Sequence, residues 1–146
     1  MITRSKGHSN NATQVVQMIQ RHQHIRQVYN EIKIKFGVRH KIIESGNTRF
    51  KTNVVISRSI MENKSVLREL VDTHYDIVRK CSAKPAIKNV FVELVSNQSF
   101  WTDLLIVLEF FEPIADILTK AESDTYYIEQ VYKDMLIIFE HITKFN

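Results

Sequence analysis

The residues with the clearest chemical potential are the cations and the aromatic side chain between positions 35 and 51. Phe50 directly follows an arginine in this stretch. Lysine and arginine bind phosphates, and an aromatic ring offers a face on which any nucleobase can stack. The cations indicate a candidate surface for nucleic-acid phosphates, and the residues alone favour a core position for Phe50. The candidate contact residues are Lys35, Arg39, Lys41, Arg49, Phe50 and Lys51.

A structural role for the same residues is the alternative. Phe50 fits a core position with Arg49 in a salt bridge, and the cations before Lys35 fit a solvated helix face. Residues 1–80 hold 15 lysines and arginines against 6 acidic residues, whereas residues 81–146 hold 5 against 10. A basic half suits nucleic acid, and it equally suits attraction to the acidic half or to a partner.

The remaining reactive side chains do not form a recognisable site. Glu109, Glu112 and Asp116 share one helix face, but no histidine or further carboxylate is spaced to complete a metal site with them. His22 and His24 would point apart on a helix. Glycine-rich phosphate loops and paired-cysteine zinc motifs are absent from the sequence. We therefore expect no catalytic residue, no metal, no cofactor and no small-molecule substrate.

The composition is that of a globular helical protein. Apolar residues make up 44% and charged residues 25%, while Gly (3) and Pro (2) are too scarce for the many turns of a sandwich or barrel. No apolar run is long enough to span a bilayer, and the first residues lack the apolar core of a signal peptide. A single cysteine, Cys81, suits a reducing compartment. These features predict an intracellular protein with no membrane partner.

Apolar side chains recur at helical spacing along most of the chain. The pattern predicts one long helix over 12–36, a loop or a brief turn of helix over 37–48, a break near Asn63, a helix start at Pro85, and a helix from Ser99 that Pro113 kinks or ends. The side chains expected to face inward from a last helix are Ile128, Val131, Tyr132, Met135, Ile138, Phe139 and Ile142. The predicted fold is all-α, an irregular bundle of about five or six helices. It forms a single domain over 1–146, with residues 1–10 disordered.

Three ordered segments resemble the hAT family of DNA transposases. Residues 46–53, Gly-Asn-Thr-Arg-Phe-Lys-Thr-Asn, resemble its Thr-Arg-(Trp/Phe) element. Residues 99–114 are similar to its Phe-Trp segment with a following proline. Residues 121–135 resemble its acidic turn and Val-Tyr-x-x-Met helix. The resemblance covers roughly residues 20–140.

The resemblance implies a position outside the catalytic core of that family. The core is an RNase H-like fold with three metal-binding carboxylates, and the matching region is a helical insertion between the second and third. The upstream Cys-x-x-His element, the BED zinc finger and the C-terminal dimerisation segment have no counterpart in this sequence. No catalytic carboxylate therefore carries over. The aromatic residue after Thr-Arg contacts a flipped base in the family, which carries over to Phe50 beside Arg49.

Two functions follow from these patterns. The first is a non-catalytic fragment of an hAT-type transposase-like protein, located in the nucleus by resemblance, with weak non-specific binding to hairpin or single-stranded DNA. The alternative is a helical protein-interaction or dimerisation module with no nucleic-acid role, suggested by the nearly all-round apolar helix that carries Trp101, Phe110 and Phe111. The expected partners are DNA, a second copy of the chain, or another transposase chain.

Overall fold

The chain folds entirely into helices over the residues that the structure describes. This computed structural model describes the backbone of residues 2–43, 50–123 and 128–145, and the side chains of 11–43, 52–123 and 128–145. The all-α class is confirmed, and eight helices in these ranges exceed the predicted five or six. The helices are α1 (Ile2–Arg21), α2 (Gln23–Lys35), α3 (Phe50–Glu62), α4 (Lys64–Thr73), α5 (Tyr75–Lys80), α6 (Pro85–Ser96), α7 (Gln98–Ala121) and α8 (Ile128–Lys144).

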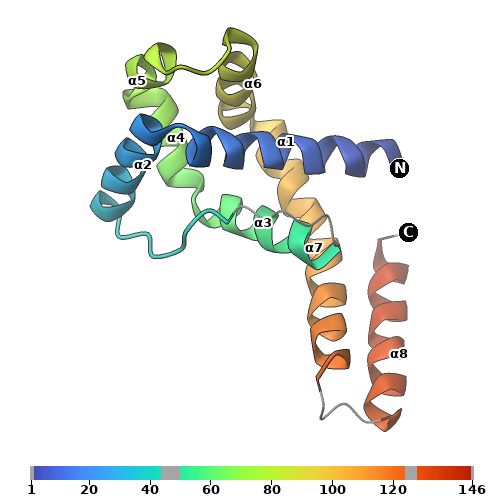
Figure 1. The fold of residues 1–146 in the computed structure, drawn as a ribbon. Coiled ribbons are helices and arrows are strands. Elements are labelled where there is room, and N and C mark those ends of the chain that lie inside the picture. The colour runs from blue at the N-terminus through green and yellow to red at the C-terminus, as the bar shows by residue number, and fades with distance from the viewer. Residues whose placement is uncertain (1, 44–49, 124–127, 146) are drawn as a thin grey trace.

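The helices are arranged as a body with an arm. Helices α1 to α6 and the first part of α7 form the body, and the rest of α7 continues away from it (Figure 1). Helix α8 returns alongside this second part of α7, so the two helices form the arm (Figure 1). Because α7 belongs to both parts, it connects the core of the body directly to the arm.

The core of the body is formed where α1 packs on α2, α3 and α6, and where α4 packs on α2 and α6. Trp101 and Phe91 are its largest fully buried side chains. The indole N–H of Trp101 donates to the carbonyl oxygen of Val95 at 2.9 Å, which satisfies the one polar group that its burial removes from water. A smaller cluster of Val54, Leu108 and Ala115 continues the apolar contact between α3 and α7.

Two backbone breaks account for the additional helices. His22 has φ −116° and ψ 103°, an extended conformation that separates α1 from α2. His74, with φ −110° and ψ 29°, separates α4 from α5. The single helix predicted over 12–36 is therefore wrong. The spacing of apolar residues indicates which face of a helix is buried. Because α1 and α2 both bury a face against the same core, the spacing continues across His22 and does not indicate the extended residue between them.

The predicted helix ends agree with the structure in some places and not in others. Pro85 lies in the first turn of α6 and Asn63 precedes α4, as expected. Helix α1 already includes residues 2–10, for which the sequence predicted disorder. Pro113 does not end α7, which continues to Ala121. A proline removes one helical hydrogen bond, and the buried Leu108 and Ala115 on either side of it offset that loss.

The largest departure concerns α8. The side chains expected to face inward are mostly exposed: 89% for Ile128, 70% for Tyr132, 64% for Met135 and 71% for Phe139. Asp134 is instead the buried residue of this helix. The expectation assumed that the body would cover the most apolar face of α8. Among the described elements, α7 is the helix on which α8 mainly packs, and α8 presents another face to it.

Two isoleucines on α2 test the described burial with matched substitutions. Ile32 is 3% exposed and Ile34 is 81% exposed. Replacing Ile32 with alanine should cost about 2–5 kcal/mol, because it removes buried methyl groups and leaves a cavity. Ile34→Ala should change the free energy of unfolding by less than about 0.5 kcal/mol. Urea denaturation of both variants measures the difference, and equal losses would contradict the described orientation of α2.

Candidate functional site

The connection from α2 to α3 carries the predicted site residues that the structure describes. The chain leaves α2 through Gly37, whose φ of 67° is readily adopted only by a residue without a side chain. Residues 38–43 then follow without regular secondary structure. The predicted loop is thus confirmed over 37–43, and its remaining residues 44–48 lie outside the described part of the chain.

This connection is fixed to the body by its own backbone and by one buried side chain. Ile42 is buried in the core, and its carbonyl oxygen accepts a hydrogen bond from Gln20 Nε2 at 3.1 Å. The N–H of Ile43 donates to Ser59 Oγ at 3.3 Å. Because these bonds reach α1 and α3, the connection has a defined position despite its irregular backbone.

A fully buried asparagine joins the same connection to three helices. Asn63, between α3 and α4, accepts a hydrogen bond from the hydroxyl of Tyr29 at 2.7 Å. Its amide nitrogen donates to the carbonyl oxygens of Ser59 at 2.8 Å and His40 at 3.1 Å. We call these side chains and carbonyls the Asn63 network. In the sequence, Asn63 indicates only a helix break, since an asparagine between two helices is most often a cap.

Burial also keeps the phenol of this network in its donor form. Removal from water raises the pKa of Tyr29 above its ordinary value, and a backbone hydrogen bond at Ile42 opposes that rise in part. The phenol therefore remains protonated at neutral pH and continues to donate to Asn63.

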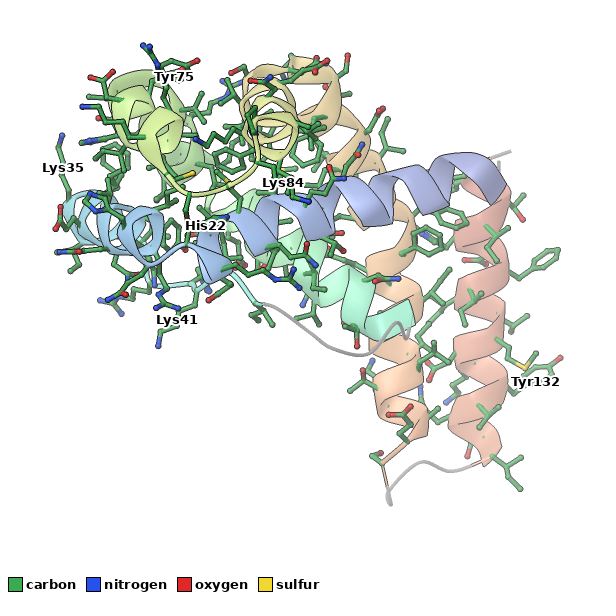
Figure 2. All side chains as sticks on the ribbon, turned by 45° about the horizontal axis from the view of Figure 1, so that its top comes forward. His22, Lys35, Lys41, Tyr75, Lys84 and Tyr132 are labelled. Carbon is green, nitrogen blue, oxygen red and sulfur yellow. The ribbon has the colours of Figure 1, made fainter. Side chains whose placement is uncertain are left out.

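The cations of the connection differ in how far they are already paired. Lys35 Nζ lies 3.9 Å from a carboxylate oxygen of Glu69 and 5.7 Å from the ring centroid of Phe36. Arg39 and Lys41 are exposed, and no acidic group among the described side chains pairs with either. Figure 2 shows Lys35 and Lys41 projecting outward from the α2 end of the body. Arg39 and Lys41 are thus the cations most accessible to an anionic ligand.

The other predicted contacts cannot be assembled with these two. Arg49 lies outside the described residues. Phe50 and Lys51 begin α3, but their side chains also lie outside the description. The structure therefore brings Lys35, Arg39 and Lys41 to one connection and leaves the stacking position of Phe50 as a prediction.

Arg58, a cation of α3 outside the connection, has a structural contact. Its guanidinium pairs with the carboxylate of Glu112 on α7. This hydrogen bond is the main reason that the pKa of Arg58 is raised, and partial burial works against it. Arg58 therefore connects the body to the arm.

A groove of about 540 Å³ lies between α1 and α6. Met18, Ile87 and Val90 supply apolar surface, and Arg21 and Lys84 supply positive charge. Figure 2 shows His22 and Lys84 near each other where α1 ends and α6 begins. No motif marks this groove, because its residues come from two helices far apart in the sequence.

Two general properties complete the description. Among the described residues, no group of three or more His, Cys, Asp or Glu side chains is placed to hold a metal ion. Within the same ranges, no helix has both the length and the apolar character required to cross a bilayer.

Comparison of the chain with protein-family models, with curated proteins and with solved structures gave no significant match.

Replacing Asn63 with alanine tests whether the Asn63 network holds the connection. The change leaves the Tyr29 hydroxyl and the carbonyl of His40 without the Asn63 side chain, which should cost about 1–3 kcal/mol of stability. Asn89→Ala, at an exposed position of α6, is the matched control. Hydrogen exchange should also become faster at the amide of Ile43. Unchanged exchange there would contradict the anchoring role.

Proposed function

We propose that this chain is a non-catalytic helical module of an hAT transposase-like protein that binds nucleic-acid phosphates through the α2–α3 connection. The observation that carries the proposal is the exposure of Arg39 and Lys41 on a backbone fixed by the Asn63 network. A DNA-binding role of this kind also implies a nuclear location.

Fixed cations favour binding because little backbone order is lost on contact with the ligand. A flexible basic loop loses conformational entropy when it binds, whereas a connection already held by hydrogen bonds loses less. With two accessible cations and Lys35 shared with Glu69, the expected binding is weak and salt-dependent. No base-reading element is needed for such an interaction.

The fold also supports the family part of the proposal. The hAT region that the sequence resembles is helical, and the described residues between 50 and 123 are helical here apart from short connections. Trp101, from the Phe-Trp segment, is a buried core residue of α7. Its role in this chain is therefore to hold α7 in the body.

Fluorescence anisotropy with a labelled single-stranded oligonucleotide tests the binding directly. We expect binding at low salt, with an affinity that falls as salt rises because each bound phosphate releases counterions. Replacing Arg39 and Lys41 together with glutamine should reduce the magnitude of the salt slope by about 1.4, from about 0.7 per lost single-strand contact. An unchanged slope would refute the assignment of these two residues.

The control removes the same amount of charge elsewhere. Lys80 and Lys120 are exposed cations at the ends of α5 and α7, away from the connection. Their double replacement with glutamine should leave the slope nearly unchanged. If both double variants weaken binding equally, general positive charge and not the connection accounts for the affinity.

Phe50→Ala tests the stacking prediction separately. A base stacked on an aromatic ring contributes about 1–3 kcal/mol, so loss of the ring should weaken binding to single-stranded DNA by at least about fivefold. Binding to a blunt duplex, in which the bases are already stacked, should not change. An equal effect on both ligands would point to a structural role for Phe50.

A further inference from the structure

The outward face of α8 carries an apolar row at regular spacing. The row alternates steps of four and three residues, which is the heptad spacing that keeps side chains on one seam of a coiled coil. We call this row the outer seam. It consists of Ile128, Tyr132, Met135, Phe139 and Ile142. All five side chains are exposed, from 39% for Ile142 to 89% for Ile128.

A second row on α8 is already occupied by α7. His141 Nε2 donates to the carbonyl oxygen of Phe110 at 2.7 Å. The ring centroid of Phe110 lies 5.8 Å from that of His141 and 5.0 Å from that of Phe145. Asp134, which accepts from Gln130 at 3.0 Å, is buried on this helix. Burying the outer seam against α7 would require α8 to rotate and break these contacts.

We propose that two copies of this chain associate through their outer seams, with the two α8 helices antiparallel. The seam is self-complementary, because a heptad row of large apolar side chains packs into the matching row of an identical helix. This proposal concerns α8 and does not depend on the nucleic-acid role of the α2–α3 connection.

The exposed area is sufficient for a specific interface. The exposed parts of the five seam side chains amount to roughly 500 Å² in each copy, taking about 200 Å² for an aromatic and about 100 Å² for an aliphatic side chain. Two copies would therefore bury about 1,000 Å², the lower bound expected of a specific protein–protein contact. Leu136, half exposed beside the seam, adds to this area.

The helix dipoles favour the antiparallel orientation. An antiparallel pair opposes the dipoles of the two α8 helices, whereas a parallel pair aligns them. The side-chain charges do not decide between the orientations, because Glu129 already pairs with Lys133 at 3.6 Å and the other end of α8 carries both Glu140 and Lys144. The seam itself carries no charge, so nucleic acid is a poor alternative occupant.

Sedimentation equilibrium of the whole chain, over a concentration series, measures the association. We expect a concentration-dependent rise from 17.2 kDa to twice that mass. Phe139→Glu places a charge in the middle of the seam and should raise the dissociation constant of the dimer at least tenfold. An effect of this size is expected when a central side chain of an interface is lost. A monomer at every concentration would overturn the proposal and leave a different protein as the occupant of the face.

Ile137→Glu is the matched control on the same helix. Ile137 is 51% exposed, and it lies about 160° around the helix from Phe139. The change is again from an exposed apolar side chain to glutamate, so the variant should still dimerise. A dimer that survives Phe139→Glu, or that is lost equally in both variants, would refute the outer seam as the interface. Circular dichroism confirms that both variants remain helical.

Spin labels determine the orientation. Thr143 is exposed at the flank of the seam, so a label at Thr143→Cys in a Cys81→Ser background replaces none of the five seam side chains. In an antiparallel pair centred on Met135 the two labelled backbones are more than about 20 Å apart. In a parallel pair they are about 10 Å apart, the distance between packed helix axes. A short distance would overturn the antiparallel arrangement.

Discussion

The position of the α2–α3 connection depends on a polar interaction inside an otherwise apolar core. Asn63 is fully buried; its side chain accepts from the Tyr29 hydroxyl and donates to two carbonyl oxygens, so one amide connects four groups. An apolar side chain at position 63 would fill the space but would leave the Tyr29 hydroxyl and the His40 carbonyl without this partner. The network thus determines where the chain runs after α2, and with it where Arg39 and Lys41 are displayed.

The body and the arm are stabilised in different ways. The body buries Trp101 and Phe91 completely, among helices that surround them. The arm is a pair of helices, and in it α8 keeps most of the apolar side chains of its outward face exposed. Its fixed contacts are a few aromatic and polar ones around Phe110 and His141. Arg58 and Glu112 add a charged contact where α7 leaves the body. Because α7 is continuous through both parts, the arm is not an independent unit.

The sequence predicted the helical class and much of the core, because residues such as Trp101 and Leu104 follow the helical period that burial imposes. It did not predict the breaks at His22 and His74, since periodicity reports faces and not single backbone dihedrals. The exposure of Phe139 was missed because an apolar row indicates that something covers it, not that the same chain does. Lys35, Arg39 and Lys41 share one connection as expected, but the Asn63 network that fixes it joins residues 23 to 34 positions apart, beyond any local pattern.

The separation of the α2 end of the body from the arm has a consequence for avidity. Lys35 and Lys41 project from one end of the molecule and α8 lies at the other (Figure 2). In a two-fold assembly built on α8, the pair of cationic connections would face outward at opposite extremes. One strand long enough to span the assembly would then meet two identical weak contacts. The second contact would form at a high effective concentration, so modest single-site affinity would suffice for durable attachment.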